Sequence, residues 1–233
     1  MANTMYFKGE SNLALGVSVT AYPAAPAPPE RGEWADVLGR EGSIWQGESN
    51  DANEKVYEQG TFPVVLWIKP TANLARVRNW LSGEGDLWFG AWNWFMRARA
   101  SAASAFTPAP FNDGWNVTIT FSVFPAWYKY PASPEILVPE SGTAVPNRGL
   151  VASKPYIILT GTGDITLQIG TRIIEIAGLS HAIEIDCEAL ASSDPLKVTI
   201  VDDLWPVLTA PTCAIYWTGN VTALYILPRW RLA

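Results

Sequence analysis

The sequence predicts a mainly β protein of two domains, with one helix in the first domain. Apolar and polar side chains alternate with a period of two over residues 115–124 and over several short segments of the second half, which is typical of strands with one buried face. Only one segment repeats apolar residues at helical spacing. The length of 233 residues exceeds the roughly 100 to 150 residues of the most common domains.

The first predicted domain covers residues 1–130. The alternation is clearest at its end, where Val117, Ile119 and Phe121 share one face and Asn116 and Thr118 share the other. Such a strand has a core face and a polar face. The other strands expected in this half lie at residues 16–22, 61–69, 85–89 and 94–100.

The predicted helix follows the strand at residues 61–69. Thr71 is a candidate N-cap, and Leu74, Val77 and Leu81 repeat on one helical face. Gly83 is placed to end the helix.

Residues 131–150 are predicted to be a proline-rich linker, because prolines recur there among Ser, Gly and Asn. Residues 151–233 then contain seven short strand-like segments, separated by glycine turns such as residues 161–164 and 218–220. Short strands at this spacing predict a compact β-sandwich as the second domain.

Charged residues are scarce. Asp, Glu, Lys and Arg make up 16% of the chain, against about 25% in ordinary soluble domains, and the chain contains 12 tryptophans. Because interface cores are poor in charge and rich in aromatic residues, part of the surface is expected to be covered by other subunits. The net charge of −6 argues against a nucleic-acid-binding protein, which needs a basic surface.

Several site classes receive no support from the sequence. Residues 1–8 lack the basic and apolar regions of a secretory leader, and no stretch has the 18 or so apolar residues of a membrane span, so we expect a soluble protein that is not exported. Cys187 and Cys213 are then expected to be buried free thiols. With His181 as the sole histidine, no metal site and no cofactor are predicted.

Catalytic motifs are also weak. His181 has no evident nucleophile or orienting carboxylate, and the glycines at 161 and 163 are interpreted as a hairpin turn, not as a phosphate loop. Paired carboxylates of a glycosidase are the one arrangement that only folding would reveal, and Asp186, Glu188, Asp202 and Asp203 are the candidates. The favoured interpretation is that these acids lie in turns and at strand edges, so no enzyme is predicted.

Trp88, Trp92 and Trp94 form a local cluster with two interpretations. They could stack on sugar rings, as in carbohydrate-binding modules, or they could belong to the core and to a subunit contact. The charge deficit favours the second interpretation. A carbohydrate-binding β-sandwich remains the alternative function.

Motifs at both ends of the chain resemble one family. Residues 38–45 (LGREGSIW) resemble the glycine-arginine turn near the start of siphophage distal tail proteins, the Dit family, and residues 80–87 (WLSGEGDL) resemble that family's helix, turn and strand. Residues 117–125 resemble the strand that closes its first domain. In the second half, residues 161–169, 178–188 and 227–231 resemble its galectin-like domain and terminal strand.

This resemblance implies a β-sandwich or barrel-like ring domain with one helix, followed by a galectin-like β-sandwich. It implies a non-catalytic virion protein, assembled in the host cytoplasm, that forms a hexameric ring at the tail tip. The implied partners are the major tail tube protein, the tail hub or tail-associated lysin, and receptor-binding proteins, with DNA passing through the ring unbound.

Subunit and partner contacts are expected at Arg40 in the glycine-arginine turn, at the tryptophan cluster, and in the acidic stretch from Trp45 to Gly60, the candidate for an arm that clasps a neighbouring subunit. The candidate interface residues are Arg40, Trp45, Glu48, Glu54, Trp88, Trp92 and Trp94.

Overall fold

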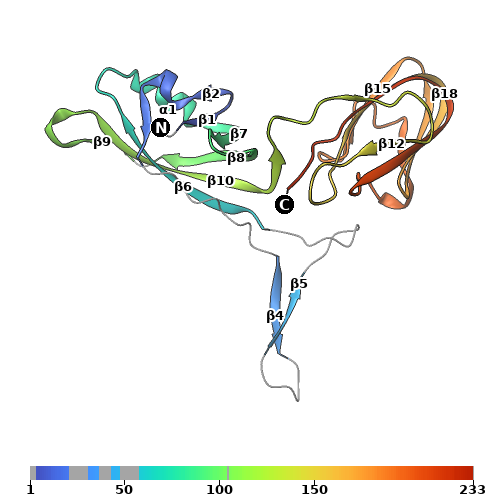
Figure 1. Cartoon of the computed structure of the whole chain (residues 1–233), viewed down its shortest axis with the longest axis horizontal. Coiled ribbons are helices and arrows are strands. Elements are labelled where there is room, and N and C mark those ends of the chain that lie inside the picture. The colour runs from blue at the N-terminus through green and yellow to red at the C-terminus, as the bar shows by residue number, and fades with distance from the viewer. Residues whose placement is uncertain (1–3, 21–30, 37–42, 48–57, 104, 233) are drawn as a thin grey trace. The chain divides into compact units, whose positions relative to one another are not determined.

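The computed structural model describes residues 4–20, 31–36, 43–47, 58–103 and 105–232. The chain forms two compact units that divide between Trp127 and Tyr128. Both units are built mainly of antiparallel strands, and the one α-helix among the described residues lies in the first (Figure 1). None of the described helices is long and apolar enough to cross a membrane.

The first unit is organised around one sheet with the strand order β2-β1-β7-β8-β10-β6-β3, in which β9 pairs with β10. A separate pair, β4 with β5, completes the described strands of this unit. The strands are β1 (Met5–Phe7), β2 (Glu10–Ser11), β3 (Val17–Val19), β4 (Gly32–Asp36), β5 (Ser43–Gly47), β6 (Gly60–Ile68), β7 (Gly83–Phe89), β8 (Trp94–Ala103), β9 (Thr107–Pro108) and β10 (Trp115–Lys129).

This sheet curls strongly. In a flat sheet, β1 and β10 would lie about 14 Å apart, because three strand spacings separate them. Instead, the ring centroids of Phe7 in β1 and Phe121 in β10 are 5.1 Å apart and meet edge to face. The predicted barrel-like fold of the first domain is therefore confirmed, with these rings in its interior.

Asn12 links strands near the two ends of the sheet order. It lies in the 3-10 helix η1 (Asn12–Leu15) and is fully buried. Its Oδ1 accepts a hydrogen bond from the Met5 backbone at 2.9 Å, and its Nδ2 donates one to the Val17 carbonyl at 2.9 Å. The amide thus joins β1 to β3 across the seam of the curled sheet.

Helix α1 (Leu74–Trp80) lies beside β1 and β2 (Figure 1). The Trp80 indole donates a hydrogen bond to the Phe7 carbonyl at 2.9 Å and packs on the Phe7 ring. The prediction of Thr71 as N-cap is wrong, because the side chain of Asn73 accepts the bond from the Arg76 amide at 3.1 Å. Gly83 does not end the helix either, since it begins β7.

The second unit is a sandwich whose two layers share two long strands. β13 (Tyr156–Ile169) and β18 (Thr212–Leu227) pair along most of their lengths. The N-terminal part of β13 pairs with β15 on its other side, and its C-terminal part pairs with β14. The remaining strands are β11 (Ile136–Leu137), β12 (Thr143–Pro146), β14 (Arg172–Leu179), β15 (Ala182–Asp186), β16 (Ala191–Ser192) and β17 (Val198–Ile200).

The prediction of a hairpin turn at residues 161–164 is wrong. The register of β13 shifts there instead, so that the strand continues through Gly161 and Gly163. A Cβ atom at Gly161 would lie 2.4 Å from the Asn220 carbonyl oxygen, so the two strands approach too closely for any other residue. Gly219, at a φ of 95°, occupies the same region of β18, which also remains one strand.

Residues 131–150, predicted as a linker, instead contribute β11 and β12 to the second unit, and both pair with β18. Among the described strands, each of the two pairs with β18 alone. Such edge positions tolerate prolines, which cannot donate a ladder hydrogen bond.

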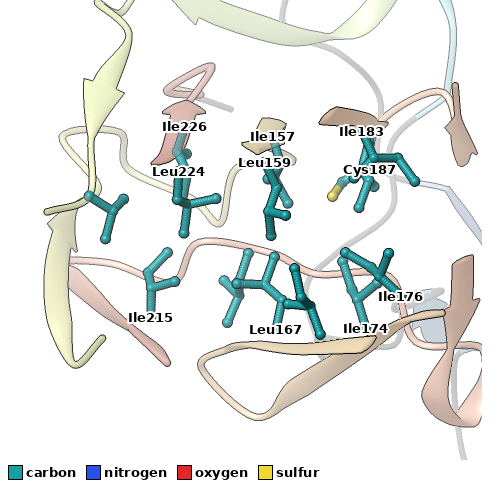
Figure 2. Packing of buried hydrophobic residues seen from close by; sticks show 14 of the residues in the cluster. Ile157, Leu159, Leu167, Ile174, Ile176, Ile183, Cys187, Ile215, Leu224 and Ile226 are labelled. Carbon is teal, nitrogen blue, oxygen red and sulfur yellow. The ribbon is translucent and has the colours of Figure 1, made fainter. Parts of the chain in front are cut away.

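The core of the second unit lies between its layers (Figure 2). Ile157, Leu159, Leu224 and Ile226 point from one layer toward Leu167 and Ile174 in the other (Figure 2). Cys187 and Cys213 are free and buried, as predicted. Two further 3-10 helices are η2 (Pro110–Asn112) in the first unit and η3 (Val201–Asp203) in the second.

Candidate interaction surface

The outward side of the first sheet carries an aromatic row. In β1 and β7 the inward residues, such as Phe7 and Phe89, are fully buried, and the residues between them point outward. Tyr6 and Trp88 lie directly opposite each other, and their rings stack with centroids 4.7 Å apart and planes within 5°. On β8, Met96 lies opposite Leu87, and its neighbour Phe95 extends the aromatic row. We call Tyr6, Trp88 and Phe95 the outer aromatic face.

Charged pairs border this face. Asp86 lies opposite Arg97, and Glu84 lies opposite Arg99, with 3.6 Å between the Glu84 and Arg99 side chains. Partial burial raises the pKa of Asp86, and the positive charge of Arg97 offsets part of the rise. An aromatic centre with a charged margin matches the anatomy of protein–protein interfaces.

The sequence predicts one cluster of Trp88, Trp92 and Trp94, but in the structure Trp88 is separate from the other two. Trp92 and Trp94 stack at 4.0 Å, and Trp94 stacks in turn on Trp127 at 4.4 Å. Trp94 is only 9% exposed, and Trp92 also packs against the buried Phe89 ring. Trp94 is therefore stacked between two indoles, and Trp92 and Trp127 each have one ring face covered by it. Ring faces are the surfaces that a sugar ring would need.

The other predicted interface residues lie largely outside the described residues. This holds for Arg40, Glu48 and Glu54. Trp45 lies in β5, opposite Trp34 in β4, and only its backbone is described. β4 and β5 pair with each other and with no other described strand.

The acids considered for catalysis in the second unit are held in an ion-pair cluster. Arg229 donates two hydrogen bonds to Asp186, at 2.6 and 2.9 Å, and approaches Glu188 at 3.5 Å. Glu188 also accepts a hydrogen bond from the Tyr128 hydroxyl. Burial opposes ionisation of Asp186, but the bonds from Arg229 and from the backbone amides outweigh it and lower the pKa of Asp186 to about 2. A carboxylate held in this way is a poor proton donor or base near neutral pH.

The remaining catalytic candidates are exposed. Asp202 and Asp203 sit side by side in η3 with positive φ angles of 58° and 55°. His181 lies at the exposed turn between β14 and β15. Within the described part of the chain, no three His, Cys, Asp or Glu side chains gather in a way that could hold a metal ion.

The tryptophans of the second unit also serve packing. Trp205 and Trp217 pack against the sandwich core. Trp230 is 5% exposed and donates a hydrogen bond to the Pro146 carbonyl at 3.0 Å, and the Arg148 guanidinium lies 5.3 Å from its ring centre. Trp230 therefore presents little ring surface for stacking.

Sequence reasoning missed Tyr6, because β1 is only three residues long. The alternation of Met5, Tyr6 and Phe7 was the available signal, and it is too short to identify a strand.

The fold of this chain is similar to that of solved structures of phage tail proteins. A chain from the SPP1 Dit protein, presented as a paradigm of the hub adsorption apparatus in phages that infect Gram-positive bacteria, matches with a TM-score of 0.66 at 13% identity, covering 97% of this chain and 98% of that one. Two chains from the phage p2 baseplate, in activated conformations with Sr and with Ca, match with TM-scores of 0.57 and 0.54 at 7% and 8% identity, covering 97% of each chain.

No protein-family model and no curated protein sequence matches the chain. The likeness therefore lies in the fold: both units, in order, have the architecture of the SPP1 Dit protein. The resemblance to distal tail proteins that the sequence motifs indicated is confirmed at this level.

Proposed function

We propose that this chain is a structural, non-catalytic distal tail protein of a siphophage, which forms a hexameric ring at the tail tip. In this role it joins the tail tube to the hub or tail-associated lysin, and its second unit docks receptor-binding proteins. The observation that carries the proposal is the fold match to the SPP1 Dit protein over 97% of the chain. A match through both units, in order, is more specific than a match to one β-sandwich.

The outer aromatic face supports a subunit contact. A large outward aromatic pair beside charged residues is typical of an interface centre, and the chain has too few charged residues to cover an isolated monomer well. The β4–β5 pair supports a second contact, because an isolated two-stranded hairpin is marginally stable in water and gains stability by packing on a partner.

The net charge supports passage of DNA. Each copy carries −6, so six copies carry about −36, and a ring of this charge repels the phosphate backbone. We expect no binding of duplex DNA even at low salt, as measured by fluorescence anisotropy.

The oligomeric state tests the proposal. Light scattering on the full chain, alone at increasing concentration and with the tail tube protein encoded beside it, should reveal a species of about 153 kDa, six times the 25.5 kDa of one chain. Neighbouring tail proteins should co-purify with it. A monomer under all these conditions, with no association to either neighbour, would refute the ring and its partners.

A double variant tests whether the outer aromatic face is the contact between subunits. Trp88→Ser combined with Tyr6→Ser should leave the chain folded and reduce self-association at least tenfold, because it removes the aromatic centre of the proposed interface. Tyr216→Ser is the matched control, since Tyr216 is an aromatic residue of the second unit that is 48% exposed. An unchanged ring in the double variant would exclude the outer aromatic face as the contact.

A further inference from the structure

The loop between β9 and β10 presents a fully exposed phenylalanine in an unfavourable backbone conformation. Phe111 lies in η2 with φ 63° and ψ 21°, inside the left-handed region that bulky side chains avoid. Its relative exposure is 102%, so the ring packs against no described part of the chain. Asparagine or glycine would fit this backbone better, and a polar residue would suit the exposure better.

The loop holds Phe111 in a fixed position. The Ala109 amide donates a hydrogen bond to the Gly114 carbonyl at 2.9 Å, and the Trp67 indole donates one to the Asp113 carbonyl at 2.8 Å. Gly114 has a φ of 106°, and a Cβ atom there would lie 2.2 Å from the Ile68 carbonyl oxygen, so β6 and this loop fit closely. An aromatic side chain on a pre-ordered loop loses little entropy when it binds, which is the property of an interface anchor.

The charge around the loop indicates the chemistry of the partner. Asp113 is the sole charged residue between Arg99 and Lys129 in the sequence, and it is exposed two positions from Phe111. An anionic membrane surface would repel this acid, and one ring buries too little area to hold a protein on lipid. A different protein with a cationic side chain at the contact complements the loop better.

We propose that Phe111 inserts into an apolar pocket of another tail protein, and that a Lys or Arg at the rim of this pocket faces Asp113. The inference rests on the proposed function, because that function makes the partner a tail protein. Its evidence is independent of the outer aromatic face. The unfavourable backbone of Phe111 is retained because the exposed ring serves binding, in the way that strained residues cluster at binding sites.

Binding of the full chain to two probes tests this inference. The probes are the purified tail tube protein and the purified hub protein encoded with this chain, measured by biolayer interferometry. Phe111→Ala should weaken binding to one of them at least tenfold, and Phe111→Leu should weaken it less. Asp113→Asn should weaken the same interaction and reduce its dependence on salt.

Two controls separate binding from folding. Leu196→Ala removes an apolar side chain that is 98% exposed in the second unit and should leave both affinities unchanged. Phe111→Asn should melt at the same temperature as the wild type or higher, because Asn tolerates the left-handed region. A variant that is at least as stable but fails to bind is the expected signature of an anchor.

Three outcomes would overturn the inference. Wild-type affinity of Phe111→Ala for both probes would exclude the anchor and leave the proposed function standing. Loss of self-association alone, measured by sedimentation velocity, would show that the occupied pocket belongs to a second copy. Binding of the wild type to neither probe would remove the proposed function together with this inference.

Discussion

Arg229 and Asp186 form a two-point ion pair in the second unit, with Nη1 2.6 Å from Oδ1 and Nη2 2.9 Å from Oδ2. The pair ties the residues after β18 to the end of β15. Both side chains are mostly covered, so neither charge regains full hydration if its partner is lost. The pair therefore has measurable consequences for stability.

Arg229→Leu should lower the free energy of unfolding by about 3 kcal/mol, because it leaves Asp186 partly buried without its cation. Urea unfolding at neutral pH measures this. Arg148→Leu is the control, since Arg148 is exposed and stacks on Trp230, and its loss should cost about 1 kcal/mol or less. Equal effects of the two substitutions would show that the ion pair makes no special contribution.

The low pKa of Asp186 predicts acid sensitivity. The folded group has a pKa of about 2, and the unfolded group has the ordinary value near 4, so the folded state favours the ionised form. This stabilisation is complete above about pH 4 and is lost as the pH falls from 4 to 2. In Asp186→Asn, the free energy of unfolding should change less across this window than in the wild type. A parallel pH dependence in the two proteins would contradict the assignment.

Asn12→Leu should destabilise the first unit by about 2 to 4 kcal/mol. It leaves the Met5 amide and the Val17 carbonyl buried without their partner, and unpaired buried backbone groups are costly. Guanidinium unfolding followed by tryptophan fluorescence measures the loss. Asn73→Ala, which removes the cap of α1, is a milder comparison at about 1 kcal/mol.

Gly219→Ala and Gly163→Ala separate steric clash from backbone preference. Both glycines have positive φ angles, 95° and 80°. A Cβ atom at Gly219 would lie 2.4 Å from the Asp164 carbonyl oxygen, whereas one at Gly163 would meet nothing within 4 Å. Gly163→Ala should cost about 1 kcal/mol, and Gly219→Ala clearly more. Similar melting temperatures for the two variants would refute the close approach of β13 and β18.

The cysteines should be inert in the folded protein. Burial, with a contribution from the negative charge of Asp186, raises the pKa of the Cys187 thiol to about 12. Because the thiolate is the reactive form, Ellman's reagent should label Cys187 and Cys213 only when the chain unfolds. Rapid labelling at neutral pH without denaturant would contradict this.

The sequence predicted strands and core residues correctly where the alternation of apolar and polar residues extended over a long segment. Val117, Ile119, Phe121 and Val123 are all buried in β10, as their alternation predicted. The conformational propensity of glycine could not reveal that Gly161 and Gly219 lie where two neighbouring strands, β13 and β18, approach each other closely. Each of these glycines also fits a hairpin turn. Only the pairing of β13 with β18, which joins residues about 60 positions apart near these glycines, distinguishes the two cases.

The candidate surface was less predictable than the fold. Trp88 was identified from composition, but its partner Tyr6 lies about 80 residues away in sequence and meets it only through strand pairing. Phe111 carried no signal, because its exposure and its left-handed backbone are properties of the folded loop. Local sequence patterns indicate which residues are apolar, and the topology decides which of them face outward.

Both layers of the second unit share β13 and β18, and this constrains how the unit can fold during synthesis. Every strand from β11 to β15 lies before β18 in the chain, yet the sheet gains its central pairing only when residues 212–227 are present. On the ribosome, the earlier strands must therefore wait with apolar edges open until β18 has been synthesised. The window for misassembly of this unit therefore lasts until its final long strand is made, and assistance from a chaperone should raise the yield of folded protein.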